Sequence, residues 1–334
     1  MSRSRPRRPV FAIFFVSVIL IAPALGGCGA EGPEEATGTS TAASSDWSAE
    51  TLGRESQNAT VTPVVINSVL GVGTNRVAIG LFTRERQLVT DATGAQLRLF
   101  SLEGDRGLFI SEHALAASTL PQEDTVHIHT DGAQHVHDTP LVTMYVANLE
   151  LPRAGFWGAE VTVTTGGRQQ RERLRFAVQP TTPEPAIGAP APASAQKTLR
   201  DGIPLADLDS SAVPQRALHD LTIAEAVRSG KPSVIAFATP AFCQTRFCGP
   251  VVEQVVVPAA QRYGERINAL HIEPFEVPAA RTGTLKTEAV MDEWGLQTEP
   301  WVFVVGKDGR VREKFEGTLS PEELIAAIER ALDA

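Results

Sequence analysis

The sequence lacks an excess of positive charge, and this excludes one large class of partner. Lys and Arg number 30 against 39 Asp and Glu, which gives a formal net charge of -9. Contacts to phosphates need clustered Lys and Arg, so we expect no binding of nucleic acid. The same shortage gives the chain no attraction to an anionic membrane surface.

The chain also lacks an internal repeat and a hydrophobic run long enough to cross a membrane. Its apolar stretch at residues 10–25 is shorter than the ~20 residues that a spanning helix needs. Of its 334 residues, 43% are apolar and 21% are charged, which is typical of a soluble globular protein. The length favours two domains.

The N-terminus has the features of an export signal. Four arginines within the first eight residues precede the apolar stretch, which ends in Leu-Gly-Gly-Cys at residues 25–28. This ending resembles the cleavage box of bacterial lipoproteins. The resemblance implies a signal peptide over 1–27 and a lipidated Cys28 as the first mature residue. We therefore expect an extracytoplasmic lipoprotein of the cell membrane, held to the lipid bilayer by an N-terminal lipid anchor. An uncleaved anchor helix, the alternative, places the body on the same side.

Composition divides the mature chain into two bodies. Residues 28–58 are rich in Ser, Thr, Gly, Ala and Glu, which predicts a disordered tether. Residues 181–199 are rich in Pro and Ala, which predicts a semi-rigid linker. The bodies that remain are 59–180 and 200–334.

The first body, 59–180, is predicted to be all-β. Short apolar segments recur along it, several with period two, and Gly166 with Gly167 supplies a hairpin turn between the last two. The expected strands lie at residues 64–69, 77–82, 97–102, 141–149, 159–164 and 173–178. The stretch at 151–161 resembles the penultimate-strand region of immunoglobulin-like extracytoplasmic modules of the YtkA or CopC kind. That resemblance implies an immunoglobulin-like β-sandwich.

The second body, 200–334, alternates signals for strand and helix. We expect a helix at 222–228, a buried strand at 232–238, a strand around 267–272, a helix around 284–294, a hairpin over 301–315 and a closing helix capped by Ser320. Over about residues 215–332 this body resembles the thioredoxin-like superfamily, through the segments 237–243, 294–300 and 302–311. The resemblance implies an α/β thioredoxin fold in which Pro300 is cis and faces the cysteines.

Cys243 and Cys248 are predicted to be the redox pair. Lipidation consumes Cys28, so these two cysteines remain, in a compartment where disulfides persist. A thiolate at a helix N-terminus is stabilised by the helix dipole and by free backbone N–H groups. Cys243, the first cysteine after the buried strand, is therefore expected to attack, and Cys248 to resolve the mixed disulfide.

The spacing of the pair differs from that of thioredoxins, which have two residues between their cysteines. Here four residues, 244–247, intervene. On one α-helix this spacing means about 7.5 Å of rise and about 140° of rotation. That exceeds the ~7 Å between Cα atoms that a disulfide allows. We therefore expect either a helix that begins near Pro250, with the pair in a flexible turn, or local unwinding on oxidation.

Other interpretations of the cysteines stay open. Some peroxiredoxins have the same spacing, although Pro240 stands where their motif has Thr. Sco-type copper chaperones use two cysteines and a distant histidine, and His271 is the candidate third ligand for Cu(I) here. The alternatives without chemistry are a structural disulfide and, for His271, a hydrogen-bonded histidine at a strand end.

A histidine cluster in the first body is a further candidate metal site. His127, His129, His135 and His137 flank a turn signal at Gly132. A hairpin centred on Gly132 pairs His129 with His135 and His127 with His137, all on one face. Such a face suits Cu(II) or Zn(II), and the alternative is a polar outer face.

Three functions follow from these residues. The first is an enzyme, a membrane-anchored thiol–disulfide oxidoreductase that acts on exported proteins with thiols or disulfides and requires no cofactor. The second is a copper-binding or copper-delivering lipoprotein that uses the cysteine pair, with the histidine cluster as a site for copper or zinc. The third is a non-catalytic binding module. Reversible thiol chemistry without metal distinguishes the first, and Cu(I) binding through the cysteines distinguishes the second.

Overall fold

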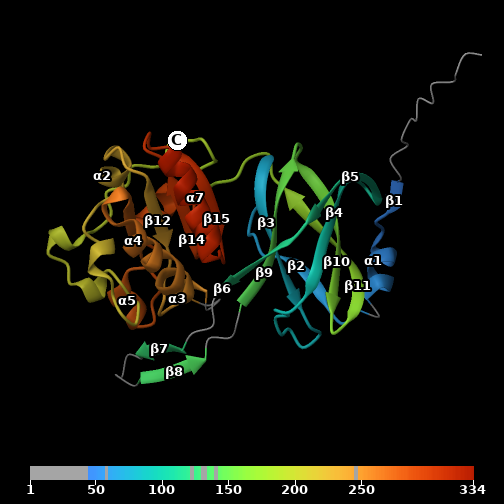
Figure 1. Cartoon of the computed structure of the whole chain (residues 1–334), viewed down its shortest axis with the longest axis horizontal. Helices are drawn as coiled ribbons and strands as arrows, with labels where there is room; N and C mark the ends of the chain where they lie inside the picture. Colours follow the sequence, from blue (N-terminus) through green and yellow to red (C-terminus); the bar gives the residue numbers. More distant parts are fainter. Residues whose placement is uncertain (1–43, 57–58, 121–123, 129–133, 139–141, 244–246) are drawn as a thin grey trace, which may run out of the picture. The chain divides into compact units, whose positions relative to one another are not determined.

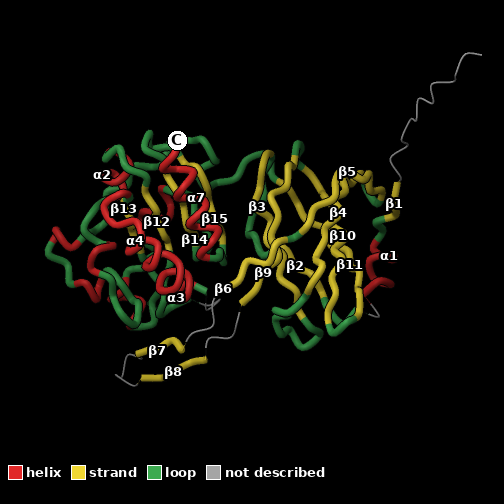
Figure 2. The backbone as a smooth tube through the Cα atoms, viewed as in Figure 1, coloured by secondary structure: helices red, strands yellow, loops and turns green. Residues whose placement is uncertain are grey.

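The computed structural model describes residues 44–56, 59–120, 124–128, 134–138, 142–243 and 247–334. By their contacts, the described residues all belong to one compact unit. Most helices of the described residues come after β11 (Arg168–Val178) in the sequence, and Figure 2 shows them, in red, around the sheet that contains β12 (Ser233–Phe237) and β14 (Trp301–Val305). Among the described residues, no helix has the length and apolar character that crossing a membrane requires.

Two antiparallel sheets form the N-terminal half of the unit. One has the strand order β1-β5-β4-β10-β11 and the other β2-β3-β9-β6. Residues of both sheets, including Tyr145 and Trp157, share one hydrophobic core. The elements are β1 (Ser44–Asp46), α1 (Ala49–Ser56), β2 (Thr62–Val65), β3 (Gly73–Phe82), β4 (Thr93–Glu103), β5 (Arg106–Ala114), β6 (Ala116–Leu120), β9 (Val142–Leu151), β10 (Gly155–Thr165) and β11 (Arg168–Val178).

The predicted hairpin turn between β10 and β11 is confirmed. Thr165 pairs with Arg168, so that Gly166 and Gly167 are the two loop residues. Both glycines have positive φ angles, 54° and 75°, as a two-residue turn of type I′ requires. An L side chain at either position would be strained.

A mixed four-stranded sheet, of order β13-β12-β14-β15, forms the C-terminal half. β12 (Ser233–Phe237) runs parallel to β13 (Asn268–Ile272) and antiparallel to β14 (Trp301–Val305). β14 and β15 (Val311–Glu316) form the predicted hairpin. All residues of β12 and β14 are buried, as in central strands covered on both faces. Figure 1 shows α7 (Pro321–Asp333), in red, beside β14 and β15.

The helical segments of this half are short, apart from α7. They are α2 (Ile223–Arg228), α3 (Cys248–Pro250), the π-helical η4 (Val251–Val256), α4 (Val257–Tyr263), α5 (Val277–Arg281), α6 (Ala289–Glu293) and the 3-10 turns η1 (Leu199–Asp201), η2 (Leu205–Asp207), η3 (Arg216–Leu218) and η5 (Gly264–Arg266). Thr222 caps α2, because Thr222 and Glu225 each accept a hydrogen bond from the other's backbone N–H. Ser320 and Glu323 cap α7 in the same way.

The predicted fold class, an immunoglobulin-like β-sandwich domain followed by a domain with an α/β thioredoxin fold, is wrong. Strands make up 39% of the described residues and helices 23%, and the three larger sheets are antiparallel or mixed. The physical reason lies in how the strands pair. Two of the three pairings in the C-terminal sheet are antiparallel, and an antiparallel pair needs only a tight turn where a parallel pair needs a crossover helix.

One hydrophobic core also connects the two halves of the unit. Met144 of β9 belongs to the same cluster as Val302 of β14 and Ile328 of α7. Beside this cluster, Arg76 Nε donates a hydrogen bond of 2.7 Å to Glu323 Oε1 of α7. The halves are thus joined by apolar burial and by an ion pair.

The Pro- and Ala-rich segment 181–199 lies along the turn and strand at the edge of the C-terminal sheet. Gly188 N–H donates to Val311 O at 2.8 Å, and Ala191 N–H donates to Gly309 O at 2.9 Å. These bonds cover part of an edge that would otherwise expose unpaired backbone groups. The segment then continues into residues that line a pocket.

The histidine-bearing strands pair in a register that differs from the prediction. β7 (Asp124–Ile128) and β8 (Gln134–Asp138) are antiparallel, with His127 opposite His135 and Thr125 opposite His137. The predicted pairing of His127 with His137 is therefore wrong by two residues. His129 and the turn around Gly132 lie outside the described residues.

Candidate functional site

The cysteine pair lies between β12 and the helix that follows it. Cys243 comes at the end of a turn after β12, and Cys248 is the first residue of α3. The helix thus begins two residues before Pro250, and Cys243 stays outside it. The two Sγ atoms are 2.7 Å apart, and both residues are thiols. Because Cys243 lies outside the helix, helical geometry does not hold the two sulfurs apart.

The two thiols differ in their surroundings. Cys248 is 0% exposed and packs with Ala238 and Val252, whereas Cys243 is only partly buried. Burial, and then the hydrogen bond and charge of Cys243, raise the pKa of Cys248 well above its usual value. Cys248 therefore stays a thiol at neutral pH, and Cys243 is the sulfur that a partner can reach.

A carboxylate accompanies the two sulfurs. An oxygen of Glu299 and both Sγ atoms lie within 4.8 Å of one another. Glu299 precedes Pro300, and the peptide bond between them is cis, as the resemblance implies for Pro300. Burial, and then the charge of Cys243, raise the pKa of Glu299 to about 7. Glu299 therefore exchanges its proton near neutral pH, next to the thiols.

A second cluster consists of Asp209, His219 and His271, whose side chains are almost completely buried. His219 Nε2 lies 3.1 Å from Asp209 Oδ2, and His271 Nδ1 lies 3.5 Å from Asp209 Oδ1. The two imidazole rings meet edge to face with centroids 5.3 Å apart. Short loops after η2 and η3 supply Asp209 and His219, and β13 supplies His271.

The charges of this cluster follow from its hydrogen bonds. Ser211 N–H and Gln215 N–H donate to Asp209 at 2.9 and 2.8 Å. Burial by itself raises the pKa of Asp209, but its bonds to the two histidines hold that pKa well below the usual range. Burial lowers the pKa of His219. Burial also acts to lower the pKa of His271, but Asp209 outweighs it and raises this pKa to about 9. The cluster therefore pairs an anionic Asp209 with a cationic His271.

The segment after β12 connects the two clusters. His271 Nε2 lies 2.9 Å from Ala238 O, and Ala238 packs against Cys248. Ser210 Oγ accepts a hydrogen bond of 3.1 Å from Ala241 N–H, and Ser210 N–H donates one of 2.7 Å to Glu273 Oε1. The position of the loop that carries Cys243 therefore depends on the histidine cluster.

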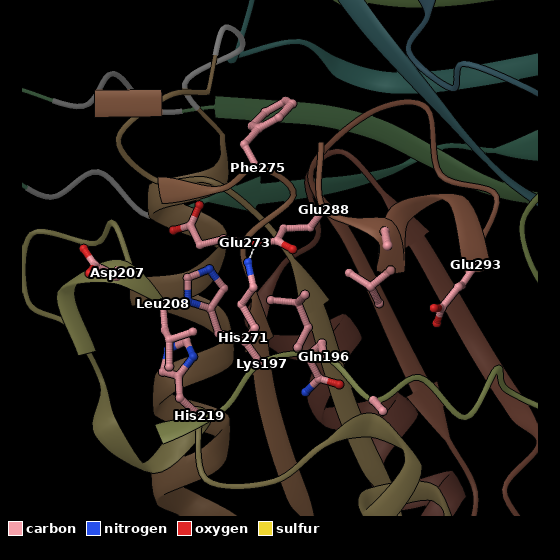
Figure 3. Close-up of a pocket in the computed structure, with 14 residues that line it drawn as sticks. Gln196, Lys197, Asp207, Leu208, His219, His271, Glu273, Phe275, Glu288 and Glu293 are labelled. Carbon is pink, nitrogen blue, oxygen red and sulfur yellow. Dashed lines mark hydrogen bonds and ion pairs between the residues drawn. The ribbon is translucent and has the colours of Figure 1, made fainter. Parts of the chain in front are cut away.

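A pocket of about 190 Å³ opens beside the histidine cluster. Figure 3 shows the imidazoles of His219 and His271 at its wall, with Glu273 next to His271. Its lining carries four carboxylates, from Asp207, Glu273, Glu288 and Glu293, and one ammonium group, from Lys197. Lys197 pairs with Glu288 at 2.7 Å. The lining is therefore negatively charged overall.

The structure brings together some of the predicted site residues and separates others. Cys243 and Cys248 are in contact, and Pro300 follows the glutamate that reaches them. His271, predicted as a third ligand beside the cysteines, groups instead with Asp209 and His219.

The remaining predicted site residues are only partly described. Cys28 and His129 lie outside the described residues. His127, His135 and His137 lie on the strands β7 and β8, for which the backbone register is known. No statement about a metal follows from that register alone.

Sequence reasoning missed Asp209, His219 and Glu299 as members of these clusters. Asp209 and His219 lie in short turns with no apolar period, far from His271 in sequence. The position of Glu299 could have been used, because it directly precedes Pro300, a proline predicted to face the thiols. The contacts of Asp209 with His219 and His271 in the folded chain show which loops meet.

Comparisons of this chain with protein-family models and with curated proteins find no match. The functional argument therefore rests on the residues themselves. Two groups of described residues have the composition of a metal site, namely Asp209 with His219 and His271, and Cys243 with Cys248 and Glu299.

Proposed function

We propose that this chain is an extracytoplasmic, membrane-anchored thiol–disulfide oxidoreductase that acts on exported proteins through Cys243 and Cys248. One observation carries the proposal. A partly exposed thiol and a buried thiol lie 2.7 Å apart at the start of a helix. Two thiols so close, with only one within reach of a partner, suit sequential attack and resolution.

The chemistry balances as two successive exchanges. The Cys243 thiolate attacks one sulfur of a partner disulfide, a bond forms between them, and the second partner sulfur leaves as a thiolate. Cys248 then attacks Cys243 Sγ and displaces the first partner sulfur. The partner gains two electrons and becomes a dithiol, and the enzyme is left with a Cys243–Cys248 disulfide. The oxidative direction is the reverse of these steps.

The second exchange needs a proton acceptor. Burial keeps Cys248 protonated, and the thiolate is the nucleophile. The Glu299 carboxylate lies within 4.8 Å of both sulfurs and has a pKa of about 7. Glu299 accepts the proton of Cys248 as that sulfur attacks, and returns it when the reaction runs the other way.

The proposed relation to the thioredoxin-like superfamily rests on the local motif alone. Three observations support it: a buried strand leads into the cysteine segment, Cys248 starts the next helix, and the Glu299–Pro300 bond is cis. The export and the lipid anchor rest on the sequence around Cys28.

Copper binding is a second candidate function, and the grouping of Cys243, Cys248 and Glu299 favours it. Two thiolates suit Cu(I), and a copper-binding or copper-delivering lipoprotein would use them as ligands. His271 lies in the other cluster, so this candidate depends on the two sulfurs. The oxidoreductase itself requires no cofactor.

Trapping of mixed disulfides in intact cells tests the proposal. In the full chain with Cys248→Ser, Cys243 can attack but no resolving thiol remains, so disulfide-linked adducts with exported proteins accumulate. The matched variant Cys243→Ser retains only the buried thiol and forms at least about tenfold fewer adducts. Absence of adducts in Cys248→Ser, together with stoichiometric Cu(I) binding that Cys243→Ser abolishes, would overturn the oxidoreductase in favour of the copper protein.

A further inference from the structure

The histidine cluster gathers buried polar atoms that lack partners. Four of the eight buried side-chain atoms without a hydrogen-bond partner, among the described residues, belong to it or to its neighbours. They are Ser211 Oγ, Thr239 Oγ1, His271 Nδ1 and Glu273 Oε2. Of these, His271 Nδ1 has Asp209 Oδ1 as a charged neighbour at 3.5 Å, too far for a good hydrogen bond. A buried polar atom without a partner is destabilising, so such a concentration indicates a place for a polar or charged ligand.

The orientation of His271 is that of a metal ligand. Ala238 O can only accept a hydrogen bond, so Nε2 of His271 donates to it at 2.9 Å. A histidine that binds a metal usually donates its second ring N–H to a carbonyl or carboxylate in this way. A metal ion would take the place of the Nδ1 proton of His271 and accept the lone pair of that nitrogen, which faces Asp209 Oδ1.

The distance between those two atoms favours a metal ion over a proton. His271 Nδ1 and Asp209 Oδ1 are 3.5 Å apart, beyond the range of about 2.7–3.2 Å for a protein hydrogen bond. Zinc bonds to nitrogen and oxygen are about 2.0–2.2 Å long, so two ligands at a tetrahedral angle lie about 3.4 Å apart. The observed separation fits a pair of ligands that share one ion.

Access to the cluster also favours a cation. His219 and His271 line the pocket of about 190 Å³, whose other charged groups are four carboxylates and one ammonium. A negatively charged cleft with apolar walls raises the local concentration of cations. The pocket thus offers a route from solvent to the buried ligand atoms.

We propose that Asp209, His219 and His271 form a binding site for a divalent cation of the zinc class. The ligand atoms, one from each residue, all lie within 4.8 Å of one another. Two imidazole nitrogens and one carboxylate oxygen are a ligand set that Zn(II) accepts, with water from the pocket in the fourth position. The site is separate from the cysteine pair and needs neither thiol.

The ion would connect parts of the chain that carry the thiols. It would join β13, through His271, to the loops of Asp209 and His219. His271 in turn holds the carbonyl of Ala238, which packs against Cys248. Zinc is therefore expected to stabilise the folded chain and to order the segment after β12.

The test uses a reference variant of the full chain from which the other candidate ligands are removed. It carries Cys243→Ser and Cys248→Ser, and Gln in place of His127, His129, His135 and His137. Equilibrium dialysis is expected to show one Zn(II) per reference chain. Co(II) in the same variant is expected to give the visible spectrum of a tetrahedral ion without a sulfur charge-transfer band. Zn(II) is also expected to raise its Tm.

Matched substitutions in the reference variant assign the ligands. His271→Ala is expected to abolish binding, and Asp209→Asn, which keeps the shape of the side chain, to weaken it at least tenfold. His113→Ala, which changes a histidine on β5 that bonds to Ser111, leaves binding unchanged. A reference variant that binds no Zn(II), or binding that survives both His271→Ala and Asp209→Asn, would overturn the site. The first result would mean that only a proton links His271 Nδ1 and Asp209 Oδ1.

Discussion

At the scale of single residues, Cys243 and Cys248 differ in their exposure to solvent because helix α3 begins at Cys248. Cys248 is enclosed by Ala238 and Val252, whereas Cys243 precedes the helix and is partly exposed. Because Cys248 has a raised pKa and little access to solvent, its sulfur is a poor nucleophile toward molecules in solution.

This inequality predicts different rates of alkylation. In the reduced chain at neutral pH, iodoacetamide is expected to modify Cys243 at least about tenfold faster than Cys248, since each unit of pKa lowers the thiolate fraction about tenfold. Mass spectrometry of peptides from samples quenched at intervals measures both rates. Denatured chain serves as the control, in which the two rates converge. Equal rates in the native chain would contradict the assigned roles.

The raised pKa of Glu299 predicts how the rate at which the mixed disulfide is resolved depends on pH. The ionised carboxylate accepts a proton, and with a pKa of about 7 it is ionised mainly above that pH. The resolution rate is therefore expected to fall as the pH drops below about 7, and Glu299→Gln to slow it about 10²-fold at pH 8. Stopped-flow measurement of partner release gives the rate. Glu293→Gln, at an exposed position on α6, is the control and leaves the rate unchanged.

The pH dependence of protein stability is a second test of the raised pKa of Glu299. Its pKa rises from 4.5 to about 7 on folding, so between these values the folded chain keeps a proton that the unfolded chain has lost. Stability then falls as the pH rises through this window. Since Glu299 is partly exposed, screening limits the loss to about 1–2 kcal/mol. Glu299→Gln is expected to remove this loss in urea unfolding at about pH 5 and pH 8, and an unchanged pH dependence would count against the raised pKa.

The site residues that could be predicted from the sequence are those whose residue type is itself distinctive. Cys243, Cys248 and Pro300 stand out because few residues share their chemistry or their effect on the backbone. Asp209 and His219 do not, because an acid or a histidine in a loop is common. Their role depends on which loops the sheet brings together, and that is a property of three-dimensional pairing.

At the scale of secondary structure elements, the ion pair between β3 and α7 has a clear energetic role. Arg76 Nε and Glu323 Oε1 are 2.7 Å apart, and the Arg76 side chain is 9% exposed. Burial by itself raises the pKa of Glu323, but Arg76 and Ser118 hold that pKa below its usual value. The stabilisation is therefore present above the usual pKa of a glutamate and is lost as the pH falls through the lowered value.

Arg76→Met is expected to lower the free energy of unfolding by about 2 kcal/mol, because it leaves the partly buried Glu323 carboxylate without its charged partner. Urea denaturation at neutral pH measures the change. Arg330→Met is the matched control, since Arg330 pairs with Glu313 at an exposed position and such pairs contribute about 0–1 kcal/mol. Similar losses in both variants would show that the β3–α7 contact is not an energetically important one.

Helices and turns that are marked by a capping residue or by a pair of glycines were predicted well. Elements without such a marker were not. Thr222, Ser320 and the Gly166–Gly167 turn lie where the sequence places them. β5 was missed because most of its residues are exposed and its apolar residues at 108–110 are consecutive, so they do not alternate with period two. The helix expected over 284–294 is confined to α6, because residues before it pair instead with the chain after β13, as in the bridge between Phe275 and Thr287.

At the scale of the whole molecule, the two predicted bodies and the segment between them are in contact with one another. The proline- and alanine-rich composition of 181–199 predicts a linker, but backbone hydrogen bonds hold this segment along the turn and strand at the sheet edge. Apolar residues of β9, β14 and α7 share one core. Neither the bonds nor the shared core can be read from composition, because they depend on which surfaces meet.

The lipid anchor proposed at Cys28 also concerns the whole molecule. Cys28→Ser is expected to move the chain from the membrane fraction to the soluble extracytoplasmic fraction, because the sulfur that accepts the lipid is lost. Fractionation and immunoblotting of cells that produce either form measure this. Cys243→Ser, which removes a different cysteine, is the control and stays in the membrane fraction. A Cys28→Ser chain that remains fully in the membrane would support the uncleaved anchor helix.

The most direct test of the account is a redox titration of the full, metal-free chain in glutathione buffers of graded potential. The fraction of Cys243 and Cys248 that resists alkylation gives the oxidised population. A single reversible two-electron transition between the dithiol and the Cys243–Cys248 disulfide, absent in Cys243→Ser and in Cys248→Ser, is the expected result. A pair that stays reduced in every buffer, or that cannot be reduced again once oxidised, would contradict the oxidoreductase.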